Sequence, residues 1–298
     1  TPAPLPSASA AAGDKTSSVD LSVQLGRLRL RNPIMVASGT FGYAREMEGL
    51  VQLEVLGAIL PKTITLQPRI GNDGVDAFVE GHLKYLRQLK PAIVVSIAGK
   101  SCDEFIELAR RIEAAGGASA LELNVSCPNV SGGVDFGTDP DLCRQVVSGV
   151  RENCQLPILA KLTPNVTRIV DIARAAADGG ADAVCCINTV LGMAVDWRNK
   201  KPLLGNKLGG LSGPAIKPIA LRCVYQVAQA VSIPIVGIGG IATLDDVMEF
   251  LAAGASSVQV GTANYYDPGV SQRLVESLPN AMRELGAKRL RDCVGTIL

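Results

Sequence analysis

Short apolar runs alternate with longer amphipathic segments along the chain from Pro33 to its end. Because these runs are brief and rich in Ala, Val, Ile and Leu, they indicate strands that are buried on both faces of a parallel sheet. Eight strands are predicted in this way, at Ile34–Ala37, Ala58–Pro61, Ala92–Ile97, Leu121–Asn124, Ile158–Lys161, Ala183–Asn188, Ile235–Gly237 and Ser257–Val260.

The segments between these runs have the apolar period of helices, and several follow a capping Asp, Ser or Thr. They are Asp103–Ala115, Asp141–Cys154, Val166–Asp178, Pro218–Val231, Leu244–Ala253 and Ser271–Leu285. Eight strand-then-helix units in 298 residues predict an α/β fold, the (β/α)8 TIM barrel. Before them, residues 23–30 alternate around Gly26, which predicts a short N-terminal β-hairpin at the bottom of the barrel.

Residues 1–18 differ from the rest because they are mostly Pro, Ala, Ser and Thr. Few of their side chains are large enough to offset the entropy lost on ordering, so we expect a flexible tail. The remainder, residues 19–298, is expected to be a single domain, since a chain with 47% hydrophobic residues can bury one large core.

Composition excludes several functions. The net charge is +1, and no apolar run approaches the roughly 18 residues of a membrane span, so we expect neither nucleic acid nor membrane as a partner. The eight cysteines lack Cys-x-x-Cys spacing and indicate reduced thiols of a cytoplasmic protein, mostly in its core. The single histidine, His82, has polar neighbours that indicate an exposed position, which sets aside hydrolytic triads and most zinc chemistry.

Active sites of such barrels lie at the carboxyl ends of the strands, where this chain places a ring of polar and glycine residues. The ring consists of Ser38 and Thr40, Lys62 and Thr63, Ser96, Asn124 with Cys127 and Asn129 beyond it, Lys161, Asn188 and Thr189, Gly239 and Gly240, and Gly261 and Thr262. Strand ends that simply meet water would also be polar. Two lysines, two asparagines and two glycine turns nevertheless exceed what solvation requires.

The glycine turns after the last two strands occupy the positions where barrels bind phosphate through backbone N–H groups. Their alternative role is to form tight turns without a ligand. Lys62 and Lys161 could stabilise negative charge on a cofactor or substrate, form a Schiff base, or be solvated lysines at the rim.

Four further residues offer recognition or chemistry. Asn124, Asn129 and Asn188 suit a planar, amide-like heterocycle, although each could instead cap a strand or form a turn. Cys127 lies on a loop beyond a strand end rather than inside an apolar run. It could be another core thiol, but its position favours a thiolate that serves as base or nucleophile.

Four motifs together resemble the dihydroorotate dehydrogenase family, and the resemblance covers Val19 to Leu298. They are Leu123–Asn129, Gly209–Pro218, Gly237–Ile241 and Gln259–Ala263. The cysteine of Ser-Cys-Pro-Asn is similar to class 1, because class 2 uses serine as the base. Segments 36–43 and 188–193 resemble the class 1B catalytic subunit in particular.

This resemblance implies FMN in the barrel mouth and oxidation of dihydroorotate to orotate, a step of pyrimidine biosynthesis. Flavin-binding residues would be Ser38, Lys62, Thr63, Ser96, Asn124, Lys161, Ile187 and Gly213, with Gly239, Gly240, Gly261 and Thr262 at the phosphate. Lys161 would lie near flavin N1. Substrate-binding residues would be Lys62, Asn124, Asn129, Asn188 and Thr189. Cys127 would remove a proton from C5 while hydride passes from C6 to the flavin.

The resemblance also implies a separate electron-transfer subunit with FAD and a 2Fe–2S cluster that reduces NAD, in a homodimer or heterotetramer. Two departures stand out. Ser96 replaces an asparagine that is usual in the family, and Asn72 runs directly into Asp73 where the family has a substrate-contacting loop. We expect a break in the chain at this junction, because both flanks match the family closely. The competing hypotheses are a Schiff-base lyase that uses Lys161 and a catalytically silent binding subunit.

Overall fold

The computed structural model describes residues 19–69, 72–126 and 136–298. The predicted tail at residues 1–18, Cys127 and Asn129 lie outside these ranges. Within the described part of the chain, no helix is long and apolar enough to cross a membrane.

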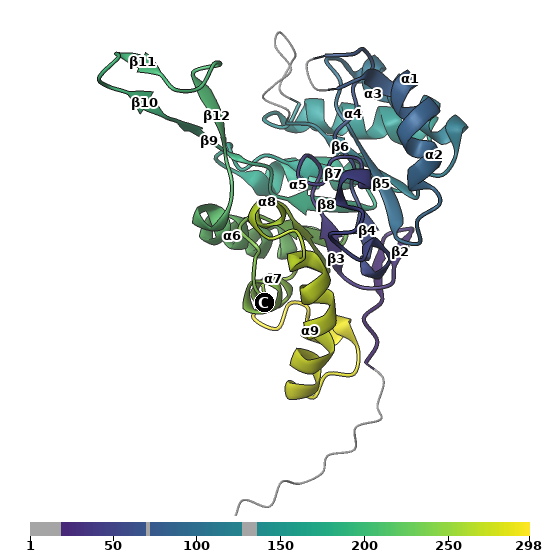
Figure 1. Cartoon of the computed structure of the whole chain (residues 1–298), viewed down its shortest axis with the longest axis vertical. Coiled ribbons are helices and arrows are strands. Elements are labelled where there is room, and N and C mark those ends of the chain that lie inside the picture. Colours follow the sequence, from purple (N-terminus) through teal and green to yellow (C-terminus); the bar gives the residue numbers. More distant parts are fainter. Residues whose placement is uncertain (1–18, 70–71, 127–135) are drawn as a thin grey trace, which may run out of the picture.

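Eight parallel strands close into a barrel, which confirms the predicted fold (Figure 1). Each strand pairs with the strand of the preceding unit, and the last, β14, closes the ring on β3. The barrel strands are β3 (Ile34–Val36), β4 (Ala58–Ile59), β5 (Ala92–Ile97), β6 (Ala120–Asn124), β7 (Ile158–Leu162), β8 (Ala183–Cys186), β13 (Ile235–Ile238) and β14 (Ser257–Val260).

The long helices surround the barrel close to their predicted positions, and side-chain caps begin three of them. Ser101 accepts from Glu104 N at 3.3 Å, Asp139 caps the next helix, and Thr243 forms a capping box with Asp246. These helices are α3 (Cys102–Ala115), α4 (Pro140–Asn153), α5 (Ile169–Asp178), α6 (Lys217–Ala228), α7 (Leu244–Ala252) and α9 (Val270–Glu284).

Shorter helical segments complete the described chain. They are η1 (Arg45–Met47), η2 (Leu53–Val55), α1 (Gly74–Ala77), the π-helical η3 (Phe78–His82), α2 (Leu83–Leu86), η4 (Pro214–Ile216), α8 (Ala263–Tyr266) and η5 (Leu290–Cys293).

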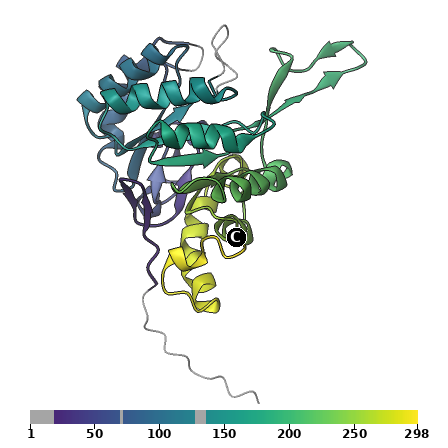
Figure 2. The ribbon, with the colours of Figure 1, turned by 180° about the vertical axis from the view of Figure 1, so that it is seen from behind.

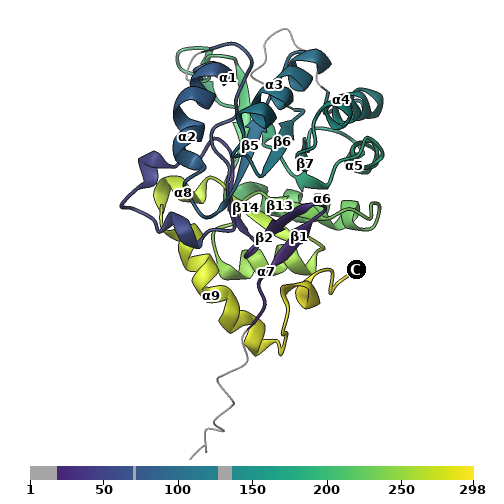
Figure 3. The same cartoon turned by 90° about the vertical axis from the view of Figure 1, so that its right-hand side faces the viewer.

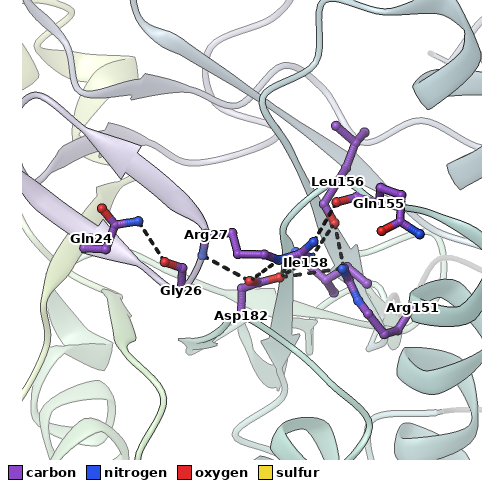
Figure 4. A network of polar contacts seen from close by, with 8 residues as sticks. All are labelled: Gln24, Gly26, Arg27, Arg151, Gln155, Leu156, Ile158 and Asp182. Carbon is purple, nitrogen blue, oxygen red and sulfur yellow. Dashed lines mark hydrogen bonds and ion pairs between the residues drawn. The ribbon is translucent and has the colours of Figure 1, made fainter.

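The predicted N-terminal hairpin is present as β1 (Val23–Leu25) and β2 (Leu28–Leu30), which pair in antiparallel register. Its apolar side chains belong to the core, and Leu290 N donates to Asp20 O at 2.9 Å, which places the hairpin beside η5 (Figure 3). Arg27 at the turn binds Asp182 and the carbonyl oxygens of Gln155 and Leu156 (Figure 4). The hairpin is therefore fixed to the floor of the barrel, the end where its strands begin.

A projecting arm between β8 and α6 was not predicted. It consists of β9 (Val190–Met193), β10 (Val195–Asp196), β11 (Lys201–Pro202) and β12 (Leu208–Leu211), which form two antiparallel pairs. Figures 1 and 2 show from opposite sides that this arm extends away from the barrel. Many of its large apolar side chains are exposed, namely Leu191, Met193, Val195, Trp197, Leu203, Leu204, Leu208 and Leu211.

The junction between Asn72 and Asp73 is closed by hydrogen bonds. Asn72 Oδ1 accepts from Gly74 N at 3.0 Å, and Asn72 Nδ2 donates to Thr63 O at 2.7 Å. Backbone bonds of 2.8 Å also join Arg69 and Asn72 in both directions. The expected break is therefore wrong, because Asn72 ties the end of the β4 loop directly to the start of α1.

Candidate active site

A cavity of about 250 Å³ opens at the carboxyl ends of the barrel strands. Ten of the flavin- and substrate-binding residues expected from the sequence line it: Ser38, Lys161, Ile187, Asn188, Thr189, Gly213, Gly239, Gly240, Gly261 and Thr262. They come from strands and loops that lie far apart in the sequence, so closure of the barrel brings them together.

Lys161 enters this cavity from below. It lies on β7, is only 5% exposed, and is buried with Glu122 of the neighbouring β6. Its Nζ lies 3.5 Å from Ser38 Oγ and 3.6 Å from Glu122 Oε1. Both distances exceed the roughly 2.7–3.2 Å of a strong hydrogen bond, and an ammonium group has several N–H donors. Lys161 therefore keeps hydrogen-bonding capacity that can be directed into the cavity.

Two asparagines from different strand ends are joined across the mouth. Asn188 Nδ2 donates to Asn124 Oδ1 at 3.1 Å and to Ser126 Oγ at 3.0 Å. Asn188 Oδ1 accepts from Thr189 N at 2.8 Å, so the amide is held on both sides. The geometry brings together two of the three predicted asparagines, while Asn129 lies outside the described residues.

The other predicted residues lie beside the cavity rather than on its wall. Thr63 and Ser96 bond to each other through their hydroxyl groups at 3.0 Å, and Ser96 is fully buried. Lys62 is half-buried, and its backbone N donates to Gly42 O at 2.9 Å. The structure thus gathers most of the predicted ring, but it leaves Lys62, Thr63, Ser96 and Asn124 outside the lining.

The glycine turns have backbone conformations that other residues rarely adopt. Gly213, Gly239 and Gly240 have φ of 89°, 132° and 75°. A Cβ on Gly240 would also lie 2.8 Å from Lys217 Cβ, whereas a Cβ on Gly261 would find its nearest neighbour at 3.5 Å. The turns therefore line the cavity with backbone atoms.

Asp246 supports the turn after β13. It accepts hydrogen bonds from Ala242 N at 2.9 Å, Thr243 N at 2.8 Å and Lys217 Nζ at 2.6 Å. Burial would raise the pKa of this carboxyl, but the hydrogen bonds from Lys217 and the two backbone N–H groups outweigh it, so the pKa is lowered. Lys217 also pairs with Glu249, which fixes α6 against α7.

The histidine and cysteine predictions have mixed outcomes. His82 is half-buried rather than exposed, because its ring stacks on Tyr43 with centroids 3.6 Å apart. It does not line the cavity. Six of the seven described cysteines are buried free thiols, as expected of core residues. Burial raises the pKa of Cys143 to about 12 and that of Cys154 to about 11, so both are protonated near neutral pH.

Sequence reasoning missed some residues of this region. Tyr265 lines the cavity and donates its hydroxyl to Gly39 O at 2.6 Å. Below the mouth, Glu122 and Gln259 are completely buried in barrel strands. A charged residue between Leu121 and Leu123 in a buried strand is a signal that could have drawn attention to Glu122.

A larger cavity of about 600 Å³ opens at the floor, between the hairpin and η5. Arg29, Arg289 and Arg291 line it together with Asp20, and none of the predicted site residues does. No group of three or more metal-ligating side chains occurs among the residues that the structure describes.

A TIM barrel with a cavity at the carboxyl ends of its strands has the architecture of an enzyme. The family model described as dihydroorotate dehydrogenase matches residues 20–79 and 72–282, so the chain belongs to the dihydroorotate dehydrogenase family.

Among similar proteins are the catalytic subunits named dihydroorotate dehydrogenase B (NAD(+)). The protein of Geotalea uraniireducens (strain Rf4) is 44% identical over 300 residues, which cover 94% of this chain and 98% of that protein. The protein of Geobacter sulfurreducens is 45% identical over 299 residues, with 93% and 98% covered. That of Bacillus pumilus is 44% identical over 296 residues, with 92% and 96% covered.

These matches also bear on the missing loop. Residues 72–79 belong to both parts of the family match, so the match divides in this region of the chain. The Geotalea alignment has 300 positions but takes in 94% of 298 residues, about 280, which leaves about 20 positions without a counterpart here. The absence of a family segment, noted from the sequence, is confirmed.

Proposed function

We propose that this chain oxidises dihydroorotate to orotate with FMN bound in the cavity at the barrel mouth. Its family consists of flavin-dependent oxidoreductases that carry out this step of pyrimidine biosynthesis. The observation that carries the proposal is the pairing of a buried cation, Lys161, with uncovered glycine turns on one 250 Å³ cavity. A flavin mononucleotide needs both features, a donor for its ring and exposed N–H groups for its phosphate.

Gly239, Gly240, Gly261 and Thr262 would hold the phosphate. The positive φ of the first two turns the backbone into a conformation that lets an anion approach closely. Thr262 Oγ1 donates to Ser212 Oγ at 2.8 Å, which fixes the side chain beside the turn.

The flavin ring would contact Ser38, Lys62, Thr63, Ser96, Asn124, Ile187 and Gly213, with Lys161 near its N1 edge. A bound flavin would supply the acceptor for the hydride from C6 of the substrate. The contribution of Lys161 is a fixed positive charge that favours the reduced, anionic form. The family usually has an asparagine at the position of Ser96. The Ser96 hydroxyl bonds to Thr63, so we expect the flavin ring to receive one hydrogen bond fewer at this position.

Lys62, Asn124, Asn129, Asn188 and Thr189 would bind the substrate, and Cys127 would remove the proton from C5. For Cys127 and Asn129 the support is the family motif, since both lie outside the described residues. The Asn124–Asn188 pair supports a site for a planar ring with amide groups. Without the family loop one wall of the substrate site is absent, so we expect a high KM for dihydroorotate.

We further propose a separate electron-transfer subunit with FAD and a 2Fe–2S cluster that passes electrons to NAD. The names of the similar proteins, catalytic subunits of an NAD(+) enzyme, support this proposal. The arm supports an assembly, either a homodimer or a heterotetramer, because its exposed apolar residues include Trp197 at 70% and Leu203 at 62%. A cytoplasmic location stays a prediction.

An absorbance spectrum before and after anaerobic addition of dihydroorotate tests the function. We expect a yellow protein whose flavin bands bleach on addition. A colourless protein, or bands that persist, would contradict the proposal, and the second result would favour a silent binding subunit. The lyase hypothesis has less support, because a Schiff-base lysine must be neutral and Lys161 faces a carboxylate.

A further inference from the structure

A carboxylate lies inside the barrel directly below the candidate site. Glu122 is completely buried, and strand alternation on β6 places it on the same side as Asn124, toward the barrel interior. The acidic residues of the described core are Glu122 and Asp246, and Asp246 belongs to the turn after β13. A buried charge is costly without a partner, so the surroundings of Glu122 must compensate for it.

Both oxygens of Glu122 have partners. Oε2 accepts from Gln259 Nε2 at 2.7 Å, and Oε1 accepts from Ser38 Oγ at 3.2 Å and faces Lys161 Nζ at 3.6 Å. Ser38 lies between the two charges, since Lys161 Nζ is 3.5 Å from its Oγ. Three barrel strands and the loop after β3 thus contribute to one polar group beneath the mouth.

Gln259 directs its donor group, rather than its acceptor, at Glu122. Its Nε2 donates to Glu122, whereas its Oε1 is buried and has no hydrogen-bond partner among the described residues. The amide therefore offers its donor to Glu122 and leaves its own acceptor unsatisfied, which is unfavourable for a buried group. The carboxylate of Glu122 is thus surrounded by the Gln259 amide, the Ser38 hydroxyl and the Lys161 ammonium, all of which can donate to it.

We propose that Glu122 is a positioning residue that holds the Lys161 ammonium below the cavity and neutralises it while the flavin is oxidised. This inference rests on the proposed function. The relative affinity for reduced and oxidised flavin is then set by the Glu122–Lys161 pair rather than by Lys161 alone. Gln259 and Ser38 hold the carboxylate in place.

The expected change in the relative affinity for reduced and oxidised flavin has a definite direction. Removal of the carboxylate leaves the cation uncompensated in a medium of low dielectric constant, which favours the anionic reduced flavin. We expect Glu122→Gln to raise the ratio of the affinity for reduced flavin to that for oxidised flavin about tenfold. This corresponds to a rise of about 30 mV in the two-electron reduction potential of the bound flavin.

A double-mutant cycle tests whether Glu122 acts through Lys161. The four proteins are wild type, Glu122→Gln, Lys161→Met and the double variant, and the readout is an anaerobic reductive titration of bound flavin against a reference dye. In the Lys161→Met background we expect Glu122→Gln to change the ratio less than about twofold, because the carboxylate then has no ammonium to position. An unchanged ratio in Glu122→Gln, or an equal change in both backgrounds, overturns the proposal.

Two further variants keep the test decisive. Asp141→Asn removes an exposed negative charge on α4 and should leave the ratio unchanged. If Glu122→Gln does not fold, a double variant that exchanges the two side chains can be used. Glu122→Gln combined with Gln259→Glu keeps one carboxylate and one amide in contact, but the carboxylate then lies on β14, farther from Lys161. Its ratio should rise above that of wild type, and a ratio equal to wild type contradicts the proposal. A wild-type protein that binds no flavin instead contradicts the proposed function.

Discussion

The charged side chains at the two ends of the barrel differ in their hydrogen bonding. At the floor, Asp182 accepts from Arg27 N, Nε and Nη2 and from Ile158 N at 2.9–3.1 Å (Figure 4). Arg151 adds an ion pair at 3.6 Å. At the mouth, the contacts of Lys161 to Ser38 and Glu122 are 3.5 and 3.6 Å long.

This difference teaches which end is built for stability and which for binding. The carboxylate of Asp182 already accepts several short hydrogen bonds, so it is not available to a ligand. These bonds join the hairpin to β7 and β8. A buried ammonium with long contacts retains donors for a ligand.

Loss of the proposed base should have the largest effect. We expect Cys127→Ala to slow flavin reduction by dihydroorotate about two orders of magnitude or more while flavin stays bound. Stopped-flow absorbance measures this rate, and in wild type it should rise as the pH approaches a free thiol's pKa of about 8.5. Unchanged kinetics in the variant would remove Cys127 from the mechanism.

Loss of the floor carboxylate should affect stability alone. Asp182→Ala removes the acceptor of Ile158 N and the carboxylate that pairs with Arg27, so we expect the free energy of unfolding to fall by about 2–3 kcal/mol in urea titrations. Gln24→Ala is the matched control on the same hairpin, where its exposed amide donates to Gly26 O. Its effect should stay within about 0.5 kcal/mol. Loss of flavin in Asp182→Ala would show that the two ends are coupled.

A charge at the glycine turns should affect binding alone. We expect Gly261→Asp to weaken flavin binding at least about tenfold, because its carboxylate would repel the phosphate. Gly240→Glu should abolish flavin retention, but its Cβ would also strike Lys217, so Gly261 gives the cleaner test. Gly81→Asp, where a Cβ meets nothing within 4 Å, is the control. Equal flavin affinity in Gly261→Asp and in the control would place the phosphate elsewhere.

The smallest effect concerns the acid stability of the turn after β13. Because the folded pKa of Asp246 is below its ordinary 3.8, its contribution to stability is full above about pH 4 and is lost as pH falls through the folded pKa. Asp246→Asn should therefore cost about 1 kcal/mol at pH 7 and less at pH 3. Urea titrations at both values measure this. A penalty that is the same at pH 3 and pH 7 would show that the charge of Asp246 has no role.

Periodicity alone predicted the barrel well, since β5 and β14 have the predicted bounds and the other barrel strands differ by a few residues at their ends. It missed the arm because its strands are short and expose apolar side chains, as Leu191 and Met193 do, against the usual burial pattern. It misplaced His82 because sequence neighbours cannot show that Tyr43, distant along the chain, covers the ring.

The sequence by itself determined the order of strands and helices and the residues at each strand end, because these follow from local period and composition. Tertiary structure decided which of those residues share a cavity and which polar groups satisfy one another. Glu122 and Gln259 are 137 residues apart, yet their side chains meet at 2.7 Å because β6 and β14 face each other across the closed barrel. No local pattern encodes that contact, since it depends on how all eight strands close.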